Sequence, residues 1–356
     1  MYPYAILYLM SALFSVLVRS TPLQRVLAGL LTIFLIVFVG TRYDVGCDYW
    51  SYARRYATLD RTKPWGQIFS ESEAGFYTLT RVVQDLGGAY STMLLVCGAI
   101  YLACLWRFSR LLDRPLGFLT LCFPVLIIQL GMSGVRQALA TGFLLMALAA
   151  FGRSKRGQFV AWVLVAMLFH TSAIVFLPIV YLIGRPVSIK RLVAALILLG
   201  PVVAWFLGER VEVYHERYIG AEYGENMSVG AWPRYAMALL PFLLFEWKKR
   251  YVQQAYPALF PLLRLFSLIS YSMVVIGVLN STALHRMVFY IMPISLVAFI
   301  VVARSVRNTP RAKFYLLLPF LMYGAYFTGW SNLSRHADAC YAPYQSWLLM
   351  PSADGR

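Results

Sequence analysis

The residues of this sequence that could carry out chemistry are a few arginines, histidines and carboxylates, which lie beside long apolar segments. The stretch GMSGVRQALATGF places Arg136 at the start of an apolar segment, two residues after Gly134 and next to Gln137. Free N–H groups at a helix start, a glycine that allows close approach and a guanidinium together suit a phosphate or pyrophosphate. The alternative is an arginine that extends to lipid headgroups.

A histidine stands in the middle of QFVAWVLVAMLFHTSAIVFLPIVYLIG, residues 158–184. An ionisable side chain inside a membrane is costly to bury and is therefore a functional candidate. Histidine suits a general base near neutral pH, so His170 is the first candidate for that role. The alternative is a buried histidine whose ring bonds a neighbouring carbonyl.

Two further segments supply cations. HRMVFY places Arg286 four residues before Tyr290, so the two share a helix face and could hold a phosphate and a sugar hydroxyl. Tyr290 could equally be an aromatic residue of the membrane interface. Arg217 and Arg234 border an outer loop and could cover a substrate, or could simply face solvent.

Carboxylates are frequent in the first polar part of the chain, where TRYDVGCDYWSY follows the apolar LTIFLIVFVG. Arg42 could bind the phosphate of an acceptor, and Asp44 and Asp48 could polarise its hydroxyl, with Asp48 the second candidate base. The same residues could instead form a salt-bridged loop, with Asp48 as a helix N-cap. Glu73 in SEAGFY is a further carboxylate for substrate, or an acid in the first turn of a surface helix.

The composition predicts an all-α integral membrane protein, and the sequence has no motif that would predict a metal or cofactor. Hydrophobic residues make up 60% of the chain and charged residues 13%, whereas soluble proteins have about 25% charged residues. No zinc-ligand spacing, Walker loop, GxSxG, GxGxxG or DxD-like clamp occurs. We expect one multi-span domain over residues 1–356, with about 12 membrane segments. These are 4–18, 22–40, 88–106, 115–131, 135–152, 158–169, 171–183, 192–208, 233–246, 257–279, 287–303 and 314–329.

The charge pattern predicts the orientation of these segments. The net charge is +17, but the cations lie in short connectors and not in one patch, which disfavours nucleic-acid binding. More than half of the 32 Lys and Arg residues stand in six connectors, which the positive-inside rule places in the cytoplasm. The six are 19–25, 107–114, 153–157, 185–191, 247–251 and 304–313. Both termini and the loops 41–87, 209–232 and 280–286 then lie outside.

Residues 158–184 do not fit two ordinary spans. Each half has about a dozen residues, or about 18 Å of α-helix, which is too short for a hydrocarbon core about 30 Å thick. We therefore expect a short helical hairpin with His170 at its apex and Thr171 or Ser172 as the cap of the second half, beside a cavity. On this topology Cys47 and Cys340 lie outside the membrane, and the sequence leaves open whether they pair.

Several short motifs together resemble the EpsG-type proteins of the Wzy-like group of bacterial polysaccharide polymerases. RYDVGCDYWSY resembles their R-x-x-x-G-x-D-Y-x-x-Y pattern, although Cys47 replaces the more usual small polar residue. EAGFYTL, VRQALA, FHTSAIVFLP and HRMVFY resemble four later elements, in the same order. Beyond residue 300 the chain resembles nothing distinctive.

The resemblance implies an inner-membrane glycosyltransferase of the GT-C kind, with its active site facing the periplasm. The donor and the acceptor would both be oligosaccharides linked to undecaprenyl pyrophosphate, and no metal or nucleotide sugar would be needed. In this scheme Arg136 and Arg286 bind the pyrophosphate with help from Arg42, and His170 or Asp48 takes the acceptor proton. Flippases and chain-length regulators would be candidate protein partners.

Two other functions stay open. A flippase or exporter of lipid-linked sugars would use the same arginines without a base, but it needs a polar path to both sides of the membrane. A ligase would transfer finished glycan with the same chemistry and would need a larger acceptor platform than loops 41–87 and 209–232 offer.

Overall fold

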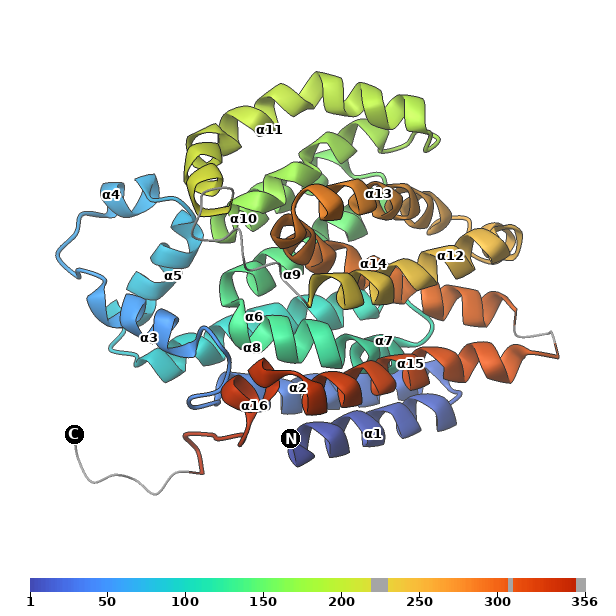
Figure 1. Cartoon of the computed structure of the whole chain (residues 1–356), viewed down its shortest axis with the longest axis horizontal. Helices are drawn as coiled ribbons and strands as arrows, with labels where there is room; N and C mark the ends of the chain where they lie inside the picture. The colour runs from blue at the N-terminus through green and yellow to red at the C-terminus, as the bar shows by residue number, and fades with distance from the viewer. Residues whose placement is uncertain (219–229, 307–309, 350–356) are drawn as a thin grey trace. The chain divides into compact units, whose positions relative to one another are not determined.

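The computed structural model describes residues 1–218, 230–306 and 310–349, and the side chains of 207–218 are not described. Apart from an isolated bridge between Arg42 and Ser346, regular structure in these residues is helical (Figure 1). The first nine helices are α1 (Tyr2–Leu17), α2 (Thr21–Gly40), α3 (Tyr49–Thr58), α4 (Trp65–Ser70), α5 (Ala74–Asp85), α6 (Tyr90–Ser109), α7 (Pro115–Cys122), the π-helical η1 (Phe123–Leu130) and α8 (Gly131–Ser133). The others are α9 (Val135–Gly152), α10 (Arg156–Phe169), the 3₁₀-helical η2 (Thr171–Leu182), α11 (Ile189–Tyr218), α12 (Ala231–Ala255), α13 (Phe260–Leu279), α14 (Ser281–Ser305), α15 (Ala312–Leu333) and α16 (Arg335–Tyr341).

Seven segments in the described part of the chain are long and apolar enough to cross a membrane. They are Thr21–Gly40, Tyr90–Ser109, Pro115–Ser133, Val135–Gly152, Ile189–Phe206, Phe260–Leu279 and Ser281–Ser305. Three shorter apolar helices are Tyr2–Leu17, Arg156–Phe169 and Thr171–Leu182. The protein is therefore a helical membrane protein, while the expected count of about 12 segments stays a prediction. The expected segment 192–208 corresponds to the span Ile189–Phe206, and the helix that contains it, α11, continues to Tyr218.

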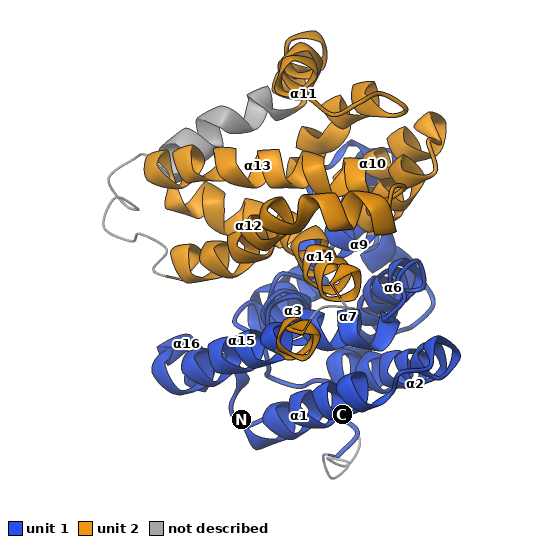
Figure 2. Cartoon of the chain, turned by 90° about the vertical axis from the view of Figure 1, so that its right-hand side faces the viewer, with its two compact units in different colours: residues 1–142, 168–170, 318–356 blue, residues 143–167, 171–317 orange. Residues whose placement is uncertain are grey.

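The chain divides into two compact units (Figure 2). Unit 1 contains residues 1–142, 168–170 and 318–356, and unit 2 contains residues 143–167 and 171–317. The expectation of one membrane domain over the whole chain stays a prediction.

In unit 1, α2 and α6 pack closely because both have a glycine at the contact. A Cβ atom on Gly40 would lie 2.8 Å from the Cα atom of Leu95, and one on Gly98 would lie 3.6 Å from the Cα atom of Gly40. Small residues let membrane helices approach at the backbone, where dispersion contacts and not burial from water drive association. This contact fixes the end of α2, from which the first polar loop leaves.

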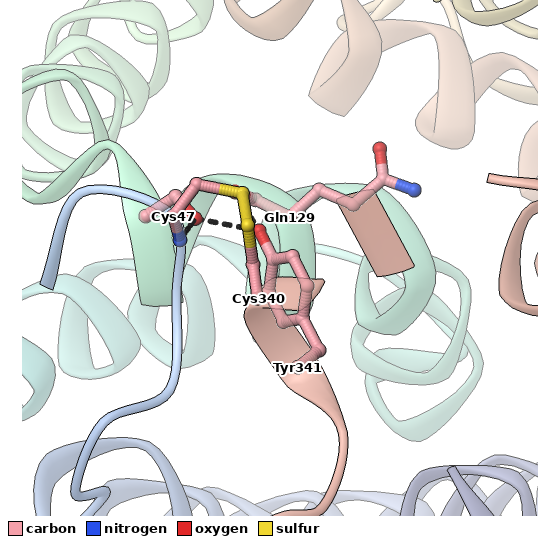
Figure 3. Close-up of a disulfide and its surroundings, with 5 residues drawn as sticks. Cys47, Gln129, Cys340 and Tyr341 are labelled. Atoms are coloured by element: carbon pink, nitrogen blue, oxygen red, sulfur yellow. Dashed lines mark hydrogen bonds between the residues drawn. A yellow bond between two sulfur atoms is a disulfide. The ribbon is translucent and has the colours of Figure 1, made fainter. Parts of the chain in front are cut away.

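That loop is fixed by the C-terminal part of unit 1. Tyr43 N–H donates to Gln345 O at 3.0 Å, Gly46 N–H donates to Cys340 O at 2.7 Å, and Cys47 and Cys340 form a disulfide (Figure 3). The sequence left open whether these two cysteines pair, and the structure shows that they do. The disulfide joins the segment before α3 to the end of α16.

The expected hairpin over residues 158–184 is confirmed; most of both arms belongs to unit 2, and residues 168–170 at its apex belong to unit 1. α10 ends at Phe169, η2 begins at Thr171, and the Arg156 guanidinium donates to Ile183 O at 3.0 Å. That bond brings the start of α10 to the end of η2, so the two segments run in opposite directions. The second arm is a 3₁₀-helix, which rises about 2 Å per residue. Its 12 residues therefore reach about 24 Å, farther than the α-helix expected from the sequence.

Elsewhere in unit 2, α12 and α13 are joined by a network of polar side chains. Arg264 of α13 donates to the Glu246 carboxylate of α12, and Ser267 donates to the same oxygen at 2.9 Å. The sequence offered no local acid for Arg264, because Glu246 lies on the preceding helix. Lys249 also approaches Glu246, at 3.4 Å, but its side chain is half exposed.

We predict that Gly46→Ala weakens the fold of unit 1. Gly46 has φ +105°, and an added Cβ would lie 2.1 Å from Met132 O, so backbone strain of about 1–3 kcal/mol is expected before any clash. Thermal unfolding of the purified protein in detergent measures the loss. Gly66→Ala is the control, because a Cβ there meets nothing within 4 Å. Equal melting temperatures for the two variants would contradict the prediction.

We also predict that Glu246→Ala destabilises the protein more than Glu246→Leu combined with Arg264→Met. The single change leaves a partly buried guanidinium without its carboxylate, at a cost of about 2 kcal/mol, below that of a fully buried pair because water reaches part of it. The double change removes both charges. Lys249→Ala, which breaks only the exposed contact, should change the free energy of unfolding by less than about 1 kcal/mol. A double variant as unstable as the single one would show that the charges themselves are not the cause.

Candidate functional site

The strongest candidate site lies in unit 1 around Glu73, the residue before α5. Its backbone is left-handed, with φ +65°, and its side chain is only 3% exposed. A glutamate in this conformation is uncommon, and such strained residues cluster at functional sites. A buried carboxylate also needs charged or polar partners.

The partner of Glu73 is Arg136, the second residue of α9. One guanidinium nitrogen donates to Glu73 Oε2, and the Arg136 side chain remains 26% exposed. An ion pair thus ties the start of α5 to the start of α9. The Arg136 side chain is thus paired and still partly accessible.

His170 adds a titratable ring to the same cluster. Its Nδ1 atom lies 3.9 Å from the other Glu73 oxygen, Oε1, and its side chain is 13% exposed. The approach depends on Gly75, because a Cβ there would lie 2.9 Å from Leu168 Cβ and 3.0 Å from Leu168 O. The glycine of EAGFY therefore lets α5 pack directly against the residues that precede His170.

Tyr52 of α3 completes what we call the unit 1 cluster: Tyr52, Glu73, Arg136 and His170. Arg136 Nε lies 3.5 Å from the Tyr52 hydroxyl, and the guanidinium carbon lies 5.7 Å from the ring centroid. Burial raises the pKa of the Tyr52 phenol above its ordinary value, while the charge of Arg136 opposes the rise. The phenol therefore stays neutral at physiological pH and can both donate and accept a hydrogen bond.

Aromatic rings surround a small cavity next to this cluster. Its lining in unit 1 includes Tyr52, Tyr56, Phe76, Tyr77 and Tyr90. Aromatic faces with hydroxyl groups suit the apolar faces and hydroxyls of a sugar.

Arg42 and Asp44, two other predicted residues of the first loop, make contacts that stabilise the loop itself. Arg42 is 2% exposed and donates to Val39 O at 2.6 Å and to Val45 O at 3.1 Å, so it braces the turn after α2. Asp44 has φ +51° and accepts a hydrogen bond from the Trp50 indole. Arg42 thus has a structural role through backbone carbonyls and not through the salt bridge that the sequence suggested as the alternative. Its role toward phosphate stays a prediction.

Two further predicted residues are close in sequence to members of the unit 1 cluster: Asp48 lies four residues before Tyr52, and Gln137 follows Arg136. Asp48 takes the N-cap position of α3, but its side chain makes no capping hydrogen bond. Its negative charge contributes to the raised pKa of Tyr52, one helical turn away. Gln137 follows Arg136 in α9 and is buried.

Unit 2 has a second group of predicted residues, on α12 and α14. Arg234 Nη1 lies 2.6 Å from His285 Nδ1, and its guanidinium carbon lies 5.5 Å from the Phe289 ring centroid. Arg286 is the next residue of α14 after His285. Because a guanidinium only donates, that ring nitrogen of His285 must carry a lone pair. We call Arg234, His285 and Arg286 the unit 2 group.

Tyr290 is one helical turn beyond Arg286 and is 1% exposed. Its hydroxyl lies 3.0 Å from Ser172 Oγ, which joins α14 to the start of η2. This placement disfavours the alternative of an aromatic residue at the membrane interface, which would keep its hydroxyl in water. The Arg217 side chain lies outside the described residues, as does much of the predicted loop 209–232.

Sequence reasoning missed two members of these groups, Tyr52 and His285. Tyr52 is the last residue of the pattern R-x-x-x-G-x-D-Y-x-x-Y and lies four residues after Asp48, so the signal was present. His285 stands next to Arg286, but its partner Arg234 is 51 residues away. No local pattern could identify that contact.

Comparisons with known proteins agree with the fold and with the motifs. Neither the curated proteins nor the solved structures gave a significant match. The family model described as "EpsG family" matches residues 25–346, which include both groups of residues described above. This match covers most of the 356 residues, and the chain belongs to the EpsG family.

Proposed function

We propose that the protein is a polysaccharide polymerase that joins repeat units linked to undecaprenyl pyrophosphate. It would act at the periplasmic face of the bacterial inner membrane, with a GT-C-like arrangement of about 12 membrane segments and without a metal ion. The observation that carries this proposal is the unit 1 cluster, in which a buried carboxylate contacts an arginine and approaches a histidine. Family membership supports a polymerase-type function.

The cluster can serve a proton transfer. In the proposed step the acceptor hydroxyl oxygen attacks the anomeric carbon of the donor sugar, and the bond from that carbon to the pyrophosphate oxygen breaks. His170 takes the hydroxyl proton, and undecaprenyl pyrophosphate leaves with the bonding electron pair. Glu73 Oε1 lies near His170 Nδ1, so the carboxylate can orient the ring and stabilise the imidazolium that forms.

Negative charge on the leaving group needs fixed cations in a site of low dielectric. Arg136 still has an exposed part, and Arg234 and Arg286 of the unit 2 group are two further guanidinium groups of the chain. We propose that these arginines bind phosphate groups of the lipid-linked substrates. The aromatic side chains around Tyr52 would contact the sugar.

The disulfide supports the outward orientation of this end of unit 1. Disulfides form in the periplasm and are rare in the cytoplasm. Cys47 and Cys340 therefore favour the periplasmic side for the segment that leads into α3. The basic connectors favour the same orientation.

A flippase or exporter is the main alternative. It needs cations for pyrophosphate but gains nothing from a carboxylate that neutralises one of them. The contact of Glu73 with Arg136 and its approach to His170 favour an enzyme over a transporter. A ligase would share this chemistry and differ in its acceptor, so the assay below separates the two.

We predict that Arg136→Ala abolishes chain extension. The test incubates purified protein with a defined lipid-linked repeat unit and resolves the products on a gel. The wild-type protein should give a ladder of regularly spaced products, whereas a transporter leaves one unchanged band and a ligase extends only an added core acceptor.

The Arg136→Lys variant separates charge from geometry and keeps Glu73 paired. Its activity should fall at least tenfold, while its melting temperature stays close to that of the wild type. Arg54→Ala, at an exposed position of α3, is the control. A normal ladder from a stable Arg136→Ala protein would refute the assignment.

We predict that His170→Gln lowers turnover more than donor binding. A base contributes about 10²–10⁴-fold to the rate, so kcat should fall by at least about 100-fold while KM for the donor changes little. Replacing exposed His336, in the same unit, with glutamine is the control. If His170→Gln raises KM and leaves kcat unchanged, His170 holds ligand or structure and is not the base.

A further inference from the structure

A cavity in unit 2 lies among basic and aromatic side chains that the proposed reaction does not use. It has a volume of about 140 Å³ and is lined by residues of α12 and α15, by Val306 after α14 and by the two residues before α15. The lining residues are Lys248, Tyr251, Val306, Pro310, Arg311 and Tyr315. Residues 247–251 and 304–313 are the basic connectors that the charge pattern places in the cytoplasm.

The charges at this cavity favour an anion. Two of its six lining residues are cations and none is an acid. The Lys248 ammonium lies 4.1 Å from the Trp247 ring centroid and 5.9 Å from the centroids of Tyr251 and Tyr315. Aromatic faces stabilise an ammonium without neutralising it. Lys248 therefore keeps its positive charge for a ligand, and the tyrosine hydroxyls can donate hydrogen bonds.

The surface next to the cavity is suited to lipid chains. Leu240, Leu243 and Trp247 are 38%, 47% and 64% exposed, and their spacing of three and four residues puts them on one face of α12. That face leads to Tyr251 in the cavity wall. On α15, Phe314 and Leu317 are 58% and 40% exposed and follow directly after the basic turn. Both helices thus combine exposed apolar residues with a cation at one end.

We propose that this cavity binds the phosphate of an anionic membrane lipid, with its acyl chains along the exposed faces of α12 and α15. Lys248 and Arg311 would contact the phosphate, and Tyr251 or Tyr315 would donate to it. The volume of about 140 Å³ is well above the roughly 10–15 Å³ that one water molecule needs on the same measure, so the cavity has room for a phosphate group. Basic pockets between membrane helices bind acidic headgroups in this way, and each cation near an anionic membrane surface strengthens binding about fivefold. The inference does not depend on the proposed enzymatic function.

The test measures lipid retention by the full-length purified protein. The protein is incubated in detergent with equal amounts of phosphatidylglycerol and phosphatidylcholine of the same chain length, and bound lipid is counted by native mass spectrometry. The wild-type protein should prefer phosphatidylglycerol. Lys248→Gln combined with Arg311→Gln should lower that preference about 25-fold, at about fivefold for each cation.

The matched control is Arg250→Gln combined with Lys313→Gln. These two exposed cations are on α12 and α15 but do not line the cavity, so the change in net charge is the same. Arg311→Gln alone, at an exposed position, covers the case in which the double variant does not fold. If both double variants lost the preference for phosphatidylglycerol equally, or if neither lost it, the proposed site would be overturned. Displacement of the lipid by millimolar inorganic phosphate would instead assign it to a soluble phosphate and overturn the lipid proposal.

Discussion

The ion pair between Glu73 and Arg136 is the contact on which the arrangement of unit 1 depends. A carboxylate with 3% exposure loses most of its hydration, and its ion pair with the guanidinium returns part of that energy. Removing one partner of such a buried pair costs about 3–5 kcal/mol. The start of α5 and the start of α9 therefore have one stable relative position. Tyr52 and His170, which approach the same two groups, take their positions from it.

The glycines show how closely this arrangement is specified by local sequence. Gly75 allows α5 to contact the backbone at Leu168, and Gly46 allows the first loop to contact the backbone at Met132. In each case a methyl group would occupy space that the neighbouring chain already fills. Each of the motifs EAGFY and RYDVGCDYW thus contains a candidate functional residue and a glycine that allows the close packing around it.

Hydropathy and charge predicted much of the fold, because both can be read from consecutive residues without knowing how the helices pack. Long apolar segments identified most helices, and the shortness of each half of 158–184 predicted the break at His170. The sequence also named Glu73, Arg136 and His170 separately. It could not pair Glu73 with Arg136, 63 residues later, or Arg234 with His285, because such contacts depend on how helices pack. Nor could it show that Arg42 points inward to Val39 O and Val45 O, since a side chain's direction at the end of a helix is set by tertiary structure.

The disulfide between Cys47 and Cys340 has a consequence for biosynthesis. The two cysteines are 293 residues apart, so nearly all the spans are synthesised between the first and the second. A ribosome adds about 5–20 residues per second, and the segment before α3 must therefore wait at least about 15 seconds for its covalent partner. During that interval the segment before α3 has no covalent partner. Maturation of this protein would then require an oxidant that reaches the two cysteines after both have been synthesised, and its yield would depend on the thiol-oxidising capacity of the compartment in which they lie.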